Sequence, residues 1–207
     1  ASNRDYIRYM QNSQLDGSQY YDLGSIMEFI ARDDKNVEKQ IGYPYYLPTK
    51  KLSIAVDPTA PAVASSIGAE RRDEVVSKMR FKLKKNNLLK NDLICLDIVA
   101  NNINERPIYF AVSVSPGSYL GLQEFFQQEG LTYRIVPLKN PSGDPQQSPI
   151  HLDRMYDVVM NKWAFGGIKE NPGVLMDENT QRLALNVISN FAKLSDALVA
   201  AGRDDDA

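Results

Sequence analysis

The chain has 207 residues, of which 43% are hydrophobic and 24% are charged, and its net charge is −2. These values are typical of a globular domain and exclude a disordered or fibrous chain. Its single cysteine and single histidine exclude an intrachain disulfide, a thiolate metal cage and a zinc site built on paired histidines.

The first third of the chain predicts an irregular arm, a helix and a strand. Residues 1–21 are polar and interrupted by Gly, Asn and Ser, which favours no regular element. Asp22 or Ser25 is a suitable N-cap for the helix that follows. Prolines disfavour a regular element within 43–48, and 51–56 then predicts a strand. The apolar residues of the helix share one face: Leu23, Ile26, Met27 and Ile30.

The middle third alternates strand and helix patterns at short spacing. Residues 78–84 alternate apolar and charged side chains, which predicts a half-exposed strand. Asn91 is a suitable N-cap for a helix that continues to about Ile103. The nearly continuous apolar run of 107–114 predicts a central strand that is covered on both faces.

Residues 115–138 continue this alternation. Ser118 is a suitable cap for a helix that Gly130 would close, and 132–138 predicts a further strand. Strands and helices in this order are typical of the α/β class. We therefore expect a small, mostly parallel, doubly wound (Rossmann-like) sheet flanked by helices.

The last third predicts an exposed loop over 140–149 and two helices. The first helix ends before Gly166-Gly167, and the second runs from about Glu178 to Ala201. We divide the chain into an α/β domain with its arm, 1–150, and a C-terminal helical segment, 151–207. That segment packs on the domain or leads to a helical region downstream. The second helix carries an apolar stripe: Ala184, Val187, Ile188, Phe191, Leu194 and Leu198.

The turn over 113–119 is the candidate ligand site. It follows the expected central strand and opens the expected helix, and free N–H groups at such a sheet edge favour anions. Ser115, Ser118 and Tyr119 would line this site. The alternative is an ordinary connection, because every α/β sheet has turns of this kind. The sequence contains no phosphate-binding glycine loop and no nucleophile elbow.

The other reactive residues favour structural roles. His151 is interpreted as a solvated or capping residue, and the apolar neighbours of Cys95 favour an inert buried thiol. Glu129 and Arg134 are close enough in sequence to form a structural ion pair. We therefore assign no catalytic residue, no metal site and no cofactor. The scattered Lys and Arg residues also argue against nucleic acid as a partner.

Aromatic side chains gather in or beside the irregular segments. A ring with a polar tip suits contact with carbohydrate or peptide, and it serves equally well as a lid over a core. Four of these residues are candidate contacts with an acceptor or a glycan: Tyr43, Tyr45, Tyr46 and Trp163.

The chain lacks a run of about 20 apolar residues and a signal peptide, so we expect no membrane span within it. Its ends resemble cut edges, which predicts an excised part of a larger protein. From about Leu23 to Ala201 it contains a set of recognisable segments, and together they resemble the extramembrane portion of multi-pass membrane proteins of the domain-of-unknown-function 2723 family. The segments are PTKKLSIAVD (48–57), LDIVANN (96–102), ERPIYFA (105–111), EGLTYRIVP (129–137), MNKW (160–163) and MDENTQR (176–182).

The resemblance implies a parent with a membrane domain of glycosyltransferase-C type, similar to protein O-mannosyltransferases. It also implies that this portion lies on the periplasmic side of a Gram-negative inner membrane. Such enzymes transfer a sugar from a lipid-phosphate donor to a protein hydroxyl. The acidic residues expected to catalyse this transfer belong to the membrane domain, so the resemblance assigns no catalytic residue to this chain. We hypothesise a non-catalytic module that contacts the membrane domain of its parent and positions a protein or glycan acceptor. The alternative is an independent α/β domain that binds a small molecule or an anion, with or without its own enzymatic activity.

Overall fold

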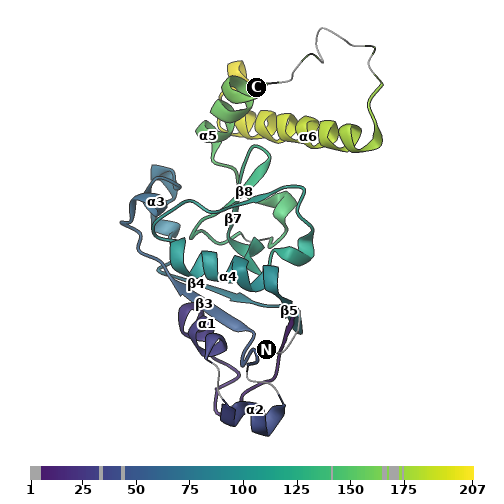
Figure 1. Cartoon of the computed structure of the whole chain (residues 1–207). Helices are drawn as coiled ribbons and strands as arrows, with labels where there is room; N and C mark the ends of the chain where they lie inside the picture. Colours follow the sequence, from purple (N-terminus) through teal and green to yellow (C-terminus); the bar gives the residue numbers. More distant parts are fainter. Residues whose placement is uncertain are drawn as a thin grey trace.

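The strands of the described residues form three small sheets. The computed structural model describes residues 6–32, 35–42, 45–140, 142–164, 167, 173 and 175–207 (Figure 1). The sheet orders are β1-β5, β2-β3-β4 and β6-β8-β7. The strands are β1 (Tyr6–Arg8), β2 (Tyr21–Asp22), β3 (Lys51–Ala55), β4 (Lys78–Lys82), β5 (Asn87–Leu89), β6 (Tyr109–Ala111), β7 (Phe126–Glu129) and β8 (Thr132–Ile135).

Helices and short helical turns connect these strands. The α-helices are α1 (Leu23–Ala31), α2 (Lys35–Ile41), α3 (Pro61–Ala64), α4 (Lys90–Asn102), α5 (Leu152–Tyr156) and α6 (Glu178–Ala200). The 3₁₀ turns are η1 (Ala69–Glu74), η2 (Pro116–Ser118), η3 (Leu122–Phe125), η4 (Pro145–Gln147) and η6 (Asp204–Asp206), and η5 (Asp157–Lys162) is a π-helical turn.

The expectation of a mostly parallel, doubly wound sheet is wrong. Within the described ranges, β2–β3 is the one parallel pairing between named strands, and the other four pairings are antiparallel. A parallel sheet requires a helical crossover between neighbouring strands. The chain instead joins β7 to β8 by a tight turn at Gly130, and it pairs β6 with β8 antiparallel.

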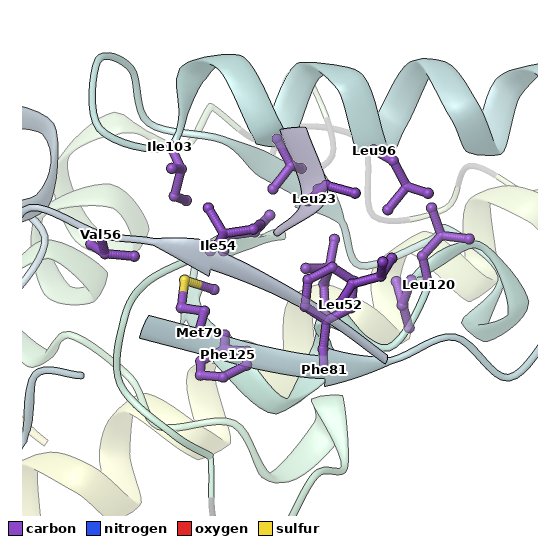
Figure 2. Close-up of a cluster of buried hydrophobic side chains, with 14 of the residues drawn as sticks. Leu23, Leu52, Ile54, Val56, Met79, Phe81, Leu96, Ile103, Leu120 and Phe125 are labelled. Atoms are coloured by element: carbon purple, nitrogen blue, oxygen red, sulfur yellow. The ribbon is translucent and has the colours of Figure 1, made fainter. Parts of the chain in front are cut away.

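The β3–β4 pair holds the main hydrophobic core. Apolar residues of β3 lie directly opposite apolar residues of β4, as Leu52 pairs with Phe81 and Ile54 with Met79. All four side chains are buried, because direct partners in an antiparallel pair point to the same face. The strands predicted over 51–56 and 78–84 are confirmed. In Figure 2 this face gathers side chains from several elements: Leu23, Leu96, Ile103, Leu120 and Phe125.

Local capping positions the helices beside this core. α1 begins as predicted, because the Asp22 carboxylate accepts a hydrogen bond from the Ser25 N–H at 2.9 Å. α4 begins at Lys90, one residue before the predicted cap at Asn91. The buried Asp92 carboxylate accepts from the Leu89 N–H at 3.0 Å and so fixes the first turn of α4.

The third sheet replaces two predicted elements. The run of 107–114 contributes only β6, a three-residue edge strand, so the prediction of a central strand is wrong. The helix predicted over 118–129 is also wrong, because this segment forms two 3₁₀ turns and β7. Leu120 and Gly121 have φ of 57° and 86°, which takes the backbone out of helical geometry. Gly130, with φ of 60°, forms the β7–β8 turn instead of closing a helix.

The C-terminal helices form a second, smaller core. α5 and η5 place Met155 and Val159 against Leu194 and Leu198 of α6. The two predicted C-terminal helices are thus confirmed. Figure 1 shows α5 and α6 at one end of the molecule and α1 and α2 at the other. Gln128 of β7 joins the second core to the rest, since its side chain bonds Asn190 and Lys193 of α6 at 2.9 and 2.7 Å.

Candidate functional site

Glu129, the last residue of β7, is the centre of a buried charged cluster. Its side chain is 5% exposed and lies 3.6 Å from Arg134 and 3.5 Å from Arg154. The Tyr109 hydroxyl donates to the same carboxylate at 3.2 Å, and the Gln127 amide donates at 3.4 Å. The predicted structural ion pair between Glu129 and Arg134 is confirmed. The cluster holds one carboxylate between two guanidinium groups and two neutral donors.

The two guanidinium groups also bind the end of α3. Arg134 donates to the Ala62 carbonyl at 2.8 Å, and Arg154 donates to the Ser65 carbonyl at 2.9 Å. Carbonyl groups at a helix C-terminus lack partners within the helix and carry partial negative charge, which cations stabilise. The cluster therefore ties α3, the β7–β8 hairpin and α5 together, and each charge of the cluster has a partner within the fold.

An open hollow of about 640 Å³ lies outside this cluster, on the side of α5 and η5. The paired charges at its rim are Asp157 with Lys162 and Asp153 with Arg203, the latter at 2.9 Å. The hollow is therefore lined by compensated charges that can exchange hydrogen bonds with a polar ligand. Its lining residues are Tyr109, Glu129, His151, Asp153, Arg154, Asp157, Val158 and Lys162.

The partners that complete the cluster were not predicted from the sequence. Tyr109 is 20 residues from Glu129, and Arg154 is 25 residues from it. Tyr109 lies in the recognisable segment 105–111 and Arg154 lies in none of these segments, and the sheet topology that brings both residues to Glu129 was not foreseen. The feature of the sequence that pointed to this cluster was the expected pairing of Glu129 with Arg134 across Gly130.

The candidate ligand turn differs from its prediction. Ser115 precedes η2, Ser118 ends it, and no longer helix follows whose free N–H groups would hold an anion. Tyr119 is buried; its hydroxyl donates to the Val114 carbonyl at 2.9 Å, and burial raises its pKa. A cavity of about 460 Å³ borders Tyr119 and the backbone of 116–117. Ligand binding at Ser115, Ser118 and Tyr119 stays a prediction. The parallel-sheet edge on which this prediction was based is not formed here.

The candidate aromatic contacts fall into two groups that pack inside the fold. Tyr46 meets Phe29 of α1 edge to face at 5.3 Å, and Tyr45 packs against the main core. Trp163 meets Phe191 of α6 edge to face at 5.9 Å. α1 and α6 lie at opposite ends of the molecule, so these rings do not form one surface (Figure 1). Tyr43 lies outside the described residues. Contact of these four residues with an acceptor or glycan stays a prediction.

The remaining reactive groups are Cys95 in α4 and His151 before α5. Cys95 is half-buried, and desolvation raises the pKa of its thiol, so the reactive thiolate is disfavoured. His151 occupies the N-cap position of α5, where its side chain makes no capping hydrogen bond. In the part of the chain that the structure describes, no group of three His, Cys, Asp or Glu residues is arranged to hold a metal ion.

α6 is long and apolar enough, by length and composition alone, to cross a membrane. This is weak evidence, because core helices of other proteins meet the same criterion. Asn190 and Lys193 of α6 bond to Gln128 of the β7–β8 hairpin. The expectation that the chain does not span a membrane stays a prediction.

Comparison with known proteins identifies one family. The family model described as TMEM260-associated domain 2 matches residues 1–154, which include all three sheets and end within α5. No curated protein and no solved structure matches the chain with significance.

Proposed function

Because the chain belongs to the TMEM260-associated domain 2 family, we propose that it is a non-catalytic extramembrane module of a membrane-bound protein O-glycosyltransferase. The match over residues 1–154 carries this proposal, since it indicates a domain associated with a membrane protein. The resemblance to the domain-of-unknown-function 2723 family adds the type of reaction, transfer of a lipid-linked sugar to a protein hydroxyl. It also adds the periplasmic side of a Gram-negative inner membrane as the location.

The charged cluster supports a role without catalysis. A carboxylate that acts as a general base needs an accessible oxygen that accepts a proton from the substrate, and this oxygen must lie within hydrogen-bond reach of that proton. The carboxylate of Glu129 is almost fully buried and faces Arg134, Arg154 and Tyr109. These surroundings of Glu129 therefore support binding of an acceptor rather than catalysis by this module.

The hollow beside the cluster is the surface on which we place the acceptor. Its volume of about 640 Å³ is within the usual range for small-ligand sites. Tyr109 is 42% exposed and its ring offers an apolar face, while Asp153 and Lys162 offer an acceptor and a donor. This combination suits a peptide with hydroxyl side chains or a short glycan.

The test compares three preparations in one assay: the membrane protein that contains this chain, the same protein without it, and the chain alone. Each receives a polyprenyl-phosphate-linked sugar and a Ser/Thr-rich acceptor protein. We expect transfer by the whole protein, a higher KM for the acceptor after deletion, and no transfer by the chain alone. Transfer by the isolated chain at the rate of the whole protein would contradict the proposal.

A point variant locates the acceptor more narrowly. Lys162→Glu changes the rim of the hollow at a side chain that is 66% exposed, so the fold is retained. We expect a higher KM for the acceptor with kcat unchanged, whereas the exposed Lys78→Glu on β4 leaves both parameters unchanged. An unchanged KM in Lys162→Glu would remove the hollow from the proposal.

A further inference from the structure

α6 carries two apolar stripes, and among the residues that the structure describes only one of them packs against other elements. Leu194 and Leu198 belong to the buried stripe and contact α5. The second stripe, here called the outer stripe, faces away from that contact. Its large members are 63% (Leu185), 62% (Ile188) and 56% (Val199) exposed. The outer stripe consists of Leu185, Ile188, Ala192, Ser195 and Val199.

The spacing of the outer stripe is that of a helix-pairing seam. Its members alternate intervals of three and four residues, which is the a/d pattern of a heptad repeat. A seam of this kind is covered by a second helix, since knobs of one helix fit holes of the other. The outer stripe therefore points to a helix as its partner.

The order of side-chain sizes along the outer stripe fits a second copy in the antiparallel direction. The large residues Leu185 and Ile188 come first, and the small residues Ala192 and Ser195 follow. In an antiparallel pair, Leu185 of one copy lies in a layer with Ser195 of the other, and Ile188 lies with Ala192. Large then meets small in the four layers that these residues form, while Val199 lies at the level of Gln181 of the other copy. A parallel pair would stack large on large and leave gaps between the small residues.

The charges beside the outer stripe are complementary in the same arrangement. Arg182 and Asp196 lie on the same flank of the stripe, 14 positions apart; both are exposed, and Arg182 also pairs with Glu178 of its own helix at 2.5 Å. An antiparallel pair brings identical flanks together and places Arg182 within about two residues, or about 3 Å, of the level of Asp196 in the other copy. The two-fold symmetry repeats this contact. Each pair of copies thus gains two opposite-charge contacts.

We propose that the outer stripe of α6 is a self-association surface, on which a second copy of this chain packs its own α6 antiparallel. A lipid surface fits less well, because interfacial helices are rich in Lys and Arg on the polar face. α6 has Arg182 and Lys193 against Glu178 and Asp196, and Lys193 bonds to Gln128. The proposal does not depend on the function proposed above.

The test is sedimentation equilibrium of the 207-residue chain over a wide range of concentration, with charge-swapped variants. We expect a reversible dimer. Arg182→Asp and Asp196→Arg each create two like-charge contacts, so each weakens the dimer by about tenfold. The double variant restores both contacts with their signs exchanged and therefore recovers an affinity close to that of the unmodified chain.

Further variants make the result decisive. Ile188→Asp places a charge in a central layer and should abolish the dimer while the helical circular dichroism is retained, whereas Lys78→Asp on β4 should change nothing. A chain that stays monomeric at every concentration overturns the proposal, as does a dimer that is indifferent to both single charge swaps. Binding to phosphatidylcholine vesicles that Ile188→Asp abolishes, with no dimer formed, would overturn it in favour of a lipid surface.

Discussion

At the scale of single residues, the described part of the chain keeps its most buried charges in pairs. Arg134 is 2% exposed and Glu129 is 5% exposed, so neither can be hydrated without opening the fold. Removing one partner of such a pair is costly, because the charge that remains is buried without compensation. This makes the cluster a stability element that can be tested apart from any ligand.

Glu129→Gln should destabilise the chain by about 3 kcal/mol, because Arg134 then stays buried without a counter-charge. The free energy of unfolding in urea measures this loss. Glu74→Gln is the matched control, since Glu74 pairs with Arg71 at the surface and is 57% exposed. We expect the control to change stability by less than about 1 kcal/mol. Equal stability of Glu129→Gln and the unmodified chain would refute the structural role of the cluster.

The ionisation of Tyr133 lowers the folding stability of the chain at high pH. Burial, with smaller effects of Tyr119 and Asp144, raises the pKa of Tyr133 to about 12. An unfolded tyrosine ionises near pH 10, so between about pH 10 and 12 the unfolded state binds fewer protons than the native state. The contribution of Tyr133 to the free energy of unfolding is therefore fully present below about pH 10. The free energy of unfolding falls by about 2 kcal/mol as the pH rises to 12.

Tyr133→Phe tests this pH dependence. The ring of Tyr133 stacks on Phe126 with centroids 5.2 Å apart, and phenylalanine keeps that contact. Urea unfolding at pH 9, 10, 11 and 12 should show a shallower loss of stability in Tyr133→Phe than in the unmodified chain. Parallel pH profiles for the two proteins would show that the hydroxyl ionises equally in both states.

At the scale of elements, strong periodicity predicted structure well and mixed signals did not. α1, α6, β3 and β4 follow a clear period of 3.6 or 2, and each was found where it was predicted. The segment 118–129 has closely spaced apolar residues that also fit a turn and a short strand. A Cβ at Gly121 would lie 2.5 Å from the Lys82 carbonyl oxygen, so tertiary contact fixes this turn. That contact cannot be read from local sequence.

The glycine at the β7–β8 turn shows how a correct signal can lead to a wrong element. Gly130 was predicted to close a helix, a position that often has a positive φ, and its φ is 60°. The same backbone geometry serves in hairpins and at helix ends. What decides between them is the cross-strand partner, since Thr132 to Ile135 pair back onto Phe126 to Glu129.

The two stripes of α6 should respond differently to truncation of a side chain. Leu194 is 2% exposed in the second core, so Leu194→Ala should weaken that core by about 2–5 kcal/mol. Ile188 is 62% exposed, so Ile188→Ala should change monomer stability by less than about 0.5 kcal/mol. Amide hydrogen exchange of α6 at low protein concentration measures both. Equal effects would mean that the outer stripe is buried in the monomer.

At the scale of the whole molecule, topology brings together the segments that form the candidate site. The cluster around Glu129 combines α3, β6, the β7–β8 hairpin and α5, which are far apart in the chain. Predicting it would have required the order of the third sheet, and the expectation of a parallel sheet gave the wrong neighbours. The assignment of no catalytic residue rests on the single histidine and on missing motifs, and it stays a prediction.

The separation of the two cores predicts that the chain can lose α6 and keep its main fold. The main core draws its buried residues from segments before residue 139, whereas Leu194 and Leu198 belong to the second core. A chain that ends at residue 174 should therefore still unfold cooperatively, with a lower midpoint and a smaller m-value, because less surface is exposed on unfolding. Gln128 loses Asn190 and Lys193 as partners but gains access to water, which limits the cost.

Removal of the opposite end gives the contrast that makes this truncation informative. A chain that begins at residue 10 lacks β1, and with it Ile7, which is buried in the main core and pairs with Leu88 of β5. This smaller deletion should cost more stability per residue removed than the loss of α6, because it opens the core on which the three sheets converge. If the chain ending at residue 174 unfolds while the one beginning at residue 10 stays folded, the C-terminal helices are part of the main folding unit. The family boundary at residue 154 would then lie inside one cooperative structure.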